Sequence, residues 1–305
     1  MVGMDTKGNG SSDHYQRTLF DQMNRASVVK QKIGNQMVTT EYIFGTKNNP
    51  EDIPEVIKAI KVNGENAVSY EFDELMRPKK RTYHTTTPVI ATYSMKAGKR
   101  LGATTDLVQR LTLGNKQIDY TYDDFGNILS ITEDNALKTT YTYDLRGQLV
   151  QEENHNLGKR VGYTYDLHGN MLSKTFTDLE NSSMVNTVSY QYNTIWKDKL
   201  SHYNGQVITY DANGNPLTYR DGMNFEWAKG RELISMTKNN VRTDYYYDSK
   251  GIRMEKKTGN ASTYFYLSGN TIVGQICGAD RFDFIYDESK NLIGFLYNGQ
   301  KYFYL

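Results

Sequence analysis

One ten-residue phrase recurs along this chain and limits what the chain can fold into. "YTYDLRGQLV" occupies residues 141–150, "YTYDLHGNML" occupies residues 163–172, and "DYTYDDFGNIL" begins at Asp119. A unit of about 22 residues is too short to bury a hydrophobic core by itself, so such units are stable only when they stack on their neighbours. The sequence therefore predicts an extended repeat array.

The position after each aromatic-x-aromatic pair marks the register of the repeat. Clear marks fall at Asp21, Asp73, Asp123, Asp144, Asp166, Asp211, Asp248 and Asp287, and weaker marks fall at Gly45, Ser94, Asn193, Ala228 and Leu267. The mean step between marks is about 22 residues, a period typical of solenoids and arrays. We therefore expect residues 15–305 to form a single array domain. Residues 1–14 are expected to be a disordered lead-in.

The residues of one copy predict a β-hairpin. Tyr141 and Tyr143 are two positions apart and so face the same side of a strand, while Thr142 faces the other side. Asp144 and Gly147 stand at the first and fourth positions of a type I turn, where glycine can adopt a positive φ and form a bulge. Tyrosines of neighbouring hairpins are expected to pack ring on ring.

The residues predicted to carry this repeated structure are the two aromatic positions, the turn aspartate and the turn glycine of each clear copy. They are Tyr120, Tyr122, Asp123, Gly126, Tyr141, Tyr143, Asp144, Gly147, Tyr163, Tyr165, Asp166, Gly169, Tyr210, Asp211, Gly214, Tyr245, Tyr247, Asp248, Gly251, Tyr286 and Asp287.

One segment competes with the strand pattern. Residues 50–60, "PEDIPEVIKAI", place apolar side chains at helical spacing, but Asn63-Gly64 follows at once and is a strong hairpin signal. We predict a hairpin over residues 56–72, preceded by a loop with room for one helical turn.

Composition agrees with an all-β fold. The chain has 25 Tyr and 25 Gly but only 5 Pro, a balance that favours strands and tight turns. We predict stacked antiparallel hairpins that form a curved or spiralling sheet. A net charge of +1 gives no electrostatic footprint for nucleic acid, and no apolar run is long enough to span a membrane. The first residues lack the basic and apolar regions of a signal peptide.

The motif Y-x-Y-D-x-x-G-x-L at this spacing resembles the YD repeats of Rhs-type bacterial proteins, which are related to teneurins and to the shell components of insecticidal toxin complexes. Variants such as "LFDQMNRAS" (19–27), "YEFDELMRP" (70–78) and "FEWAKGRELISM" (225–236) fit the same pattern, as does the closing "FIYDESKNLIGFLYNGQKYFYL". The resemblance covers the chain from about residue 15 to its end.

The resemblance implies a long sheet that spirals into a hollow shell around a C-terminal toxin or another polypeptide. Many members of the family cut themselves at an Asp-Pro site, but these 305 residues contain no Asp-Pro dipeptide and no recognisable core segment. We therefore expect a fragment or truncated product of a larger shell protein. Its expected partner is the missing C-terminal core or toxin polypeptide, and its expected location is the bacterial cell surface or the secreted fraction.

No residues in the sequence form a recognisable catalytic or metal site, and no cofactor is expected. The aspartates are assigned to turns. The segment 211–222 begins like a calcium loop but has Pro216 where glycine is required and no glutamate at its twelfth position. The five histidines lack ligand spacing, and Cys277, the single cysteine, is assigned to a small buried position rather than to a nucleophile.

The function predicted from the sequence is a non-enzymatic structural segment of a shell that encapsulates or displays a polypeptide. The alternative is a cell-surface module that binds glycans through rows of aromatic side chains. Trp196 and Trp227 are the first candidates for stacking on a sugar ring, although packing between hairpins would also account for them.

The turn assignment makes a direct prediction. Gly147→Val should lower the free energy of unfolding by about 1–2 kcal/mol, because a β-branched side chain disfavours a positive φ. Thermal unfolding of the variant measures this cost, and an unchanged midpoint would contradict the assignment.

Overall fold

The computed structural model describes residues 2–4, 14–46 and 56–304, and these residues form 28 strands. Within those ranges no helix is present, so none is long and apolar enough to cross a membrane. The strands belong to an 18-stranded and a 10-stranded sheet. By its internal contacts the chain divides into two compact units, Met1–Thr92 with Asp244–Leu305 (unit 1) and Tyr93–Thr243 (unit 2).

The strands of unit 1, including β8 and β22 at its boundaries, are β1 (Val2–Met4), β2 (His14–Phe20), β3 (Ala26–Ile33), β4 (Gln36–Phe44), β5 (Ile57–Val62), β6 (Glu65–Phe72), β7 (Pro78–Tyr83), β8 (Val89–Ala97), β22 (Val241–Tyr247), β23 (Arg253–Thr258), β24 (Ala261–Ser268), β25 (Thr271–Cys277), β26 (Asp280–Tyr286), β27 (Leu292–Tyr297) and β28 (Gln300–Phe303).

The strands of unit 2 are β9 (Thr104–Leu113), β10 (Lys116–Tyr122), β11 (Ile128–Glu133), β12 (Ala136–Tyr143), β13 (Leu149–Asn154), β14 (Lys159–Tyr165), β15 (Met171–Asp178), β16 (Met184–Tyr192), β17 (Leu200–Tyr203), β18 (Gln206–Val207), β19 (Thr218–Tyr219), β20 (Met223–Ala228) and β21 (Glu232–Lys238).

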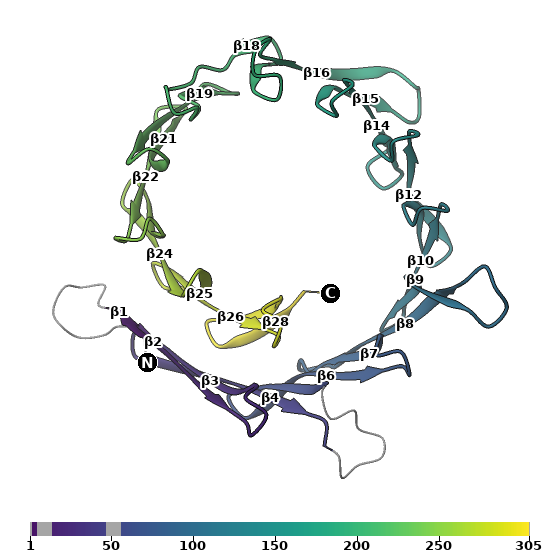
Figure 1. Cartoon of the computed structure of the whole chain (residues 1–305), viewed down its shortest axis with the longest axis vertical. Helices are drawn as coiled ribbons and strands as arrows, with labels where there is room; N and C mark the ends of the chain where they lie inside the picture. Colours follow the sequence, from purple (N-terminus) through teal and green to yellow (C-terminus); the bar gives the residue numbers. More distant parts are fainter. Residues whose placement is uncertain (1, 5–13, 47–55, 305) are drawn as a thin grey trace. The chain divides into compact units, whose positions relative to one another are not determined.

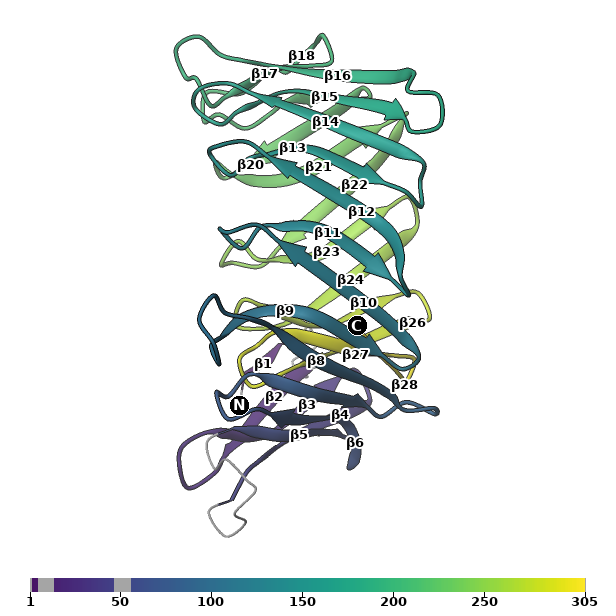
Figure 2. The ribbon, with the colours of Figure 1, turned by 90° about the vertical axis from the view of Figure 1, so that its right-hand side faces the viewer.

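Strands that follow one another in sequence pair with one another. In unit 2 each strand from β9 to β18 is antiparallel to the next, and Figure 2 shows β10 to β16 stacked in sequence order with their turns at the two sides. In unit 1 the same rule holds from β1 to β8 and from β23 to β28. The predicted all-β fold of antiparallel hairpins is confirmed.

The two kinds of turn alternate along this meander. The motif turns, such as the one between β12 and β13, are accompanied by a register shift in the ladder at Thr142/Tyr143. At the opposite ends of the strands, many of the turns have two residues, such as Asp134-Asn135, both of which have positive φ values as a type I′ turn requires. Others are longer, such as the turns between β13 and β14 and between β15 and β16. In each unit the motif turns therefore lie at one end of the strands, and the other turns lie at the opposite end.

The competing segment resolves as a hairpin. β5 and β6 pair as antiparallel strands across Asn63-Gly64, as predicted for residues 56–72. The helical turn allowed before them falls mainly on residues 47–55, which lie outside the described residues.

The structure describes only part of the predicted N-terminal lead-in, residues 1–14. Most of the expected lead-in, residues 5–13, lies outside the described residues, but Val2–Met4 is strand β1 and pairs with β2, so this part of the lead-in is not disordered as expected. Three residues that continue the sheet ladder account for the difference, because the ladder satisfies their backbone groups. The single array domain over 15–305 stays a prediction.

The core of the molecule lies in unit 1, where β26 and β27 pack across β4 to β6 (Figure 1). Ile60, Ile285 and Leu296 are almost completely buried there and meet side chains from both layers. Gly294, in β27, faces the backbone of the neighbouring strand so closely that a Cβ would clash with the Tyr302 carbonyl. The pairing of β27 with β28 is therefore close enough to require glycine at this position.

An ion pair is buried in the same unit. The Arg281 guanidinium donates to both carboxylate oxygens of Asp283 at 2.7 Å, and it also donates to the Ile33 carbonyl at 2.6 Å. Only 10 % of the Arg281 side chain and 4 % of the Asp283 side chain are exposed. A buried pair of this kind is tolerated because each charge has its hydrogen-bond partners, and it fixes β26 against β3.

Unit 2 is a single layer. Among the described apolar residues of that unit, only Val188 and Ile208 are fully buried. Its tyrosines are half-buried on one face of the sheet, and the threonines between them are exposed on the other. Stability in this unit must therefore come mainly from contacts between neighbouring strands.

Candidate functional site

Each repeat turns at an aspartate whose side chain caps the turn. Asp144 Oδ1 accepts hydrogen bonds from the backbone N–H groups of Arg146 at 2.8 Å and Gln148 at 2.9 Å. The N–H of Gly147 donates to the Asp144 carbonyl at 3.0 Å, and Gly147 has a φ of 76°. This geometry is a type I turn followed by a residue in the left-handed region, and the carboxylate satisfies backbone groups that the turn leaves without strand partners.

The same cap recurs in both units. A carboxylate oxygen accepts from the N–H four residues further on at Asp21, Asp73, Asp123, Asp166, Asp211, Asp248 and Asp287. The glycine position has a positive φ at Gly126, Gly147, Gly169, Gly214 and Gly251. The same turn geometry is therefore repeated along the array, with an aspartate at the same position in each of these copies.

The cap has a second half that was not predicted from the sequence. Asn170 Nδ2 donates to Asp166 Oδ2 at 2.9 Å, and the equivalent bond forms in three other copies, Asn127 to Asp123, Asn215 to Asp211 and Asn291 to Asp287. The signal was present, because asparagine recurs four positions after the aspartate in these copies. In two copies of unit 1 arginine replaces it, and Arg25 and Arg77 pair with Asp21 and Asp73.

These hydrogen bonds favour the ionised aspartate. The side-chain bond from Asn127 lowers the pKa of Asp123 below its ordinary value of 3.8, and Asn170 and Asn215 do the same for Asp166 and Asp211. In their ionised form, all three carboxylates accept the hydrogen bonds that hold their turns.

A second recurring contact ties each repeat to the one before it. The phenol of Tyr143 donates to the backbone carbonyl of Ile128 at 2.9 Å, and the phenol of Tyr165 donates to that of Leu149 at 2.8 Å. Each acceptor stands two positions after the turn glycine of the preceding copy. Burial raises the pKa of both phenols, so they stay protonated donors at neutral pH. We call this contact the aromatic lock.

Wherever the lock is present, it uses the second aromatic position of the motif; the copy at Asp73 has Phe72 there, which has no hydrogen-bond donor. The lock also joins Tyr122 to Val108, Tyr192 to Met171, Tyr210 to Leu200 and Tyr286 to Ile272, and in one copy the indole N–H of Trp227 makes it to Pro216 at 2.7 Å. The sequence indicated the aromatic spacing but gave no sign of the acceptor, because a backbone carbonyl leaves no mark in the sequence.

The first aromatic position plays a different part. Tyr120, Tyr141 and Tyr163 lie half-buried on the same face as the lock tyrosines. The Tyr120 ring contacts the Tyr122 ring of its own strand, with centroids 6.5 Å apart. The expected ring packing between neighbouring copies is present between Tyr203 and Tyr219, whose ring centroids lie 5.6 Å apart. The copies that carry Tyr143 and Tyr165 are joined to their predecessors by the phenol-to-carbonyl bond.

The copy at Tyr245 to Gly251 keeps the turn and adds a cation. Asp248 caps Lys250 and Ile252, and the Arg253 guanidinium lies 4.4 Å from the centroid of the Tyr245 ring and 5.8 Å from that of Tyr247. The aromatic pair of this copy is therefore covered by a side chain of the return strand.

The two tryptophans lie in different settings. Trp227 lies in β20 and its indole N–H is engaged in the lock. Trp196 lies in a turn, is 59 % exposed, and has the Lys199 amine 5.4 Å from its ring centroid and Gly214 packed beneath it. Sugar stacking by Trp196 and Trp227 stays a prediction.

The other side chains considered as metal ligands or nucleophiles lie apart from one another in the described residues. Within the described ranges, no group of three or more His, Cys, Asp or Glu side chains could hold a metal ion. Cys277 lies in β25 and is half-buried rather than fully buried as expected, because this strand end borders the turn at Gly278. Asp211 to Asn215 form a motif turn and not an ion-binding loop.

A chain built from capped hairpins, seven of which are locked to their predecessors by an aromatic side chain, is a structural β-repeat array. The family described as Teneurin YD-shell matches residues 116–305. The chain belongs to this family, and it is a segment of a YD-repeat shell.

The chain spans only a small part of the length of the known proteins that it resembles. The tRNA3(Ser)-specific nuclease WapA of Bacillus spizizenii is 33 % identical over 139 residues, which is 43 % of this chain and 6 % of that protein. A TcdB2-TccC3 crystal structure without the hypervariable C-terminal region has a TM-score of 0.71 at 16 % identity, over 94 % of this chain and 16 % of that chain. The Photorhabdus luminescens Tc holotoxin pore has a TM-score of 0.66 at 15 % identity, over 97 % and 17 %. These structures share the fold.

The aromatic lock predicts a specific loss of stability. Tyr143→Phe and Tyr165→Phe should each lower the free energy of unfolding by about 1 kcal/mol, because each leaves a carbonyl without its donor. Tyr141→Phe is the matched control, since the Tyr141 hydroxyl makes no hydrogen bond within the described structure. Urea unfolding measures all three, and equal effects of the three substitutions would contradict the lock.

The capped turns predict a loss of stability in acid. The folded pKa values of Asp123, Asp166 and Asp211 lie below the ordinary 3.8, so their contribution to stability is complete above that value and is lost as the pH falls from it through the lower folded pKa values. The thermal midpoint should therefore fall steeply below about pH 4. The variant with Asp123→Asn, Asp166→Asn and Asp211→Asn should have a lower thermal midpoint at pH 7. Its midpoint should also decrease less as the pH is lowered. Asp198→Asn, at an exposed carboxylate that makes no hydrogen bond within the described ranges, should leave the profile unchanged, and a triple variant with the wild-type profile would refute the link.

Proposed function

We propose that this shell segment is non-enzymatic and that it encloses or displays another polypeptide, a toxin carried C-terminal to the array in the same larger protein. The proposal places the protein at the bacterial surface or among secreted proteins. Nucleic acid is not among the proposed partners.

One observation carries the proposal. The sheet of unit 2 is a single layer whose tyrosine-bearing face is only half-buried, although this face carries most of its aromatic surface. Sheets normally bury such a face against a second layer. A polypeptide lying on the face would supply that layer, and the inter-repeat locks would keep the sheet intact without it.

The relatives support the same role. WapA is named as a nuclease, and the matched stretch is 6 % of that protein, so the remaining length leaves room for a separate catalytic part. We therefore assign any toxic activity of the larger protein to a region other than this chain. The glycan-binding alternative has weaker support, because the Trp227 indole N–H is already bonded within the array.

The test is protease protection of the C-terminal polypeptide. The full reading frame that contains this chain is expressed, treated with protease, and purified through a tag on the array. We expect the C-terminal polypeptide to remain bound and to be digested at least about tenfold more slowly than the same polypeptide expressed alone. Enclosure should keep the protease from reaching its accessible, unfolded segments.

The control separates enclosure from simple tethering. A variant with Tyr143→Phe, Tyr165→Phe and Tyr192→Phe should lose part of the protection, whereas Tyr141→Phe should retain it. Digestion at the same rate with and without the array would refute enclosure. Saturable glycan binding that is lost on Trp196→Ala would favour the alternative.

A further inference from the structure

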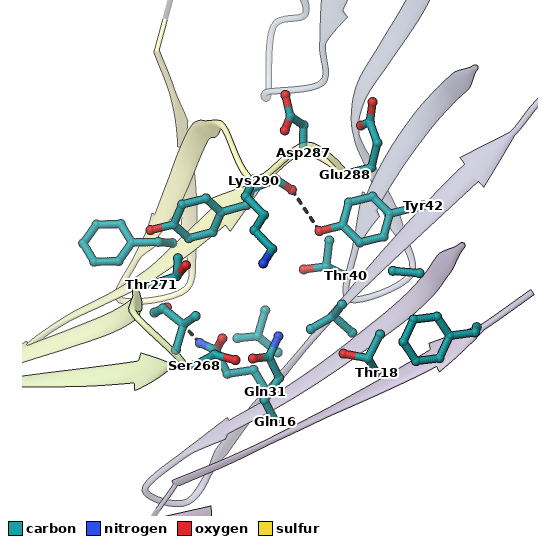
Figure 3. Close-up of a pocket in the computed structure, with 17 residues that line it drawn as sticks. Gln16, Thr18, Gln31, Thr40, Tyr42, Ser268, Thr271, Asp287, Glu288 and Lys290 are labelled. Carbon is teal, nitrogen blue, oxygen red and sulfur yellow. Dashed lines mark hydrogen bonds between the residues drawn. The ribbon is translucent and has the colours of Figure 1, made fainter. Parts of the chain in front are cut away.

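A cavity of about 380 Å³ lies within unit 1, between the N-terminal hairpins and the strands that pack across them. β2, β3 and β4 form one wall, and residues of β24 to β26 with the turn after β26 form the other. Pockets of a few hundred Å³ hold small molecules of about monosaccharide size. Figure 3 shows its polar side chains extending from both walls.

Lys290 supplies the positive charge of this cavity. It occupies the glycine position of the turn that begins at Asp287, and it has a φ of 65°, where a lysine is strained. Five other copies have glycine here, while Asn24 and Met76 share the positive φ. Figure 3 shows the Lys290 amine pointing into the cavity, and Lys290 is the only cationic side chain among the described lining residues.

Gln16 provides an unsatisfied acceptor on the opposite wall. Its Oε1 is buried and has no hydrogen-bond partner, whereas the amide of Gln31 beside it donates to the Val273 carbonyl at 2.9 Å. A buried acceptor without a donor is costly, so a ligand that brings a hydroxyl or N–H to Gln16 would be favoured.

The rest of the lining matches a polyhydroxylated ring. Hydroxyls of Thr18, Thr40 and Thr271 border the cavity, and the aromatic rings of Phe284 and Tyr286 provide an apolar wall. This combination of an aromatic face with convergent hydroxyl and amide groups suits a molecule with one apolar face and a polar edge.

Two carboxylates, Asp287 and Glu288, border the cavity. Figure 3 shows Asp287 and Glu288 pointing away from the centre. Asp287 is bonded to the backbone and side chain of Asn291, and Glu288 is exposed to solvent. Of the charged side chains that line the cavity, Lys290 is the one directed toward its centre.

We propose that this cavity binds a uronic acid, a monosaccharide whose carboxylate pairs with Lys290 and whose hydroxyls donate to Gln16 and bond the threonines. The carboxylate meets the single cation, the ring lies along the aromatic wall, and a ring hydroxyl satisfies the buried oxygen. The site is independent of the proposed enclosure of a polypeptide, because it lies wholly within unit 1.

Calorimetric titration of the 305-residue chain with glucuronate, glucose and acetate tests the proposal. Glucuronate should bind saturably and at least about tenfold more tightly than either of the others, since each lacks one half of the recognised chemistry. Acetate binding as tight as that of glucuronate would reduce the cavity to an anion site and overturn the proposal, and so would the absence of saturable glucuronate binding.

Lys290→Gly gives a test that misfolding cannot mimic. Glycine relieves the positive φ, so the variant should unfold at the same temperature or higher, yet its glucuronate affinity should fall at least about tenfold. Met76→Gly makes the same backbone change at a turn outside the cavity and should leave binding unchanged. A Lys290→Gly variant that retains full affinity, or a Met76→Gly variant that loses it, would overturn the proposal.

Discussion

The hydrogen bond from an aromatic side chain to the backbone of the preceding repeat is the interaction on which this array depends. Strand pairing alone would join hairpins edge to edge, but it would leave a wide single layer free to twist and shear. The phenol of Tyr143 crosses from one hairpin to the start of the return strand in the one before, so it fixes the position of each turn relative to the last. Each such bond contributes about 1 kcal/mol, and many identical bonds in series make the layer cooperative.

Two strategies of stabilisation coexist in the chain. Unit 1 uses an ordinary core, with Ile60 and Ile285 buried between two layers and the Arg281–Asp283 pair tying β26 to β3. Unit 2 has almost no fully buried apolar side chains among its described residues and relies on ladders, capped turns and locks. The difference explains why the tyrosine motif is most regular in unit 2, where no second layer compensates for a missing lock.

Much of the fold could be predicted from the sequence because its determinants are local. The aromatic spacing, the Asp144 to Gly147 turn and the hairpin over residues 56–72 all depend on residues a few positions apart. The aromatic lock and the packing of Gly294 could not be predicted, because both depend on backbone atoms of another strand. The Asn170 bond to Asp166 was within reach of the sequence, since the spacing recurs, but only geometry shows which side-chain atoms meet.

Each lock joins a repeat only to the repeat before it. The regular part of the array therefore depends on contacts between neighbouring repeats. A gene that gains or loses one whole copy changes the length of the wall while every remaining contact keeps its partner. A gain or loss of an odd number of residues within a strand would turn its tyrosines to the opposite face and break the lock at that point. Recombination between copies should therefore be tolerated in steps of about 22 residues. The number of repeats, and with it the size of the wall, can then change during evolution without loss of the fold.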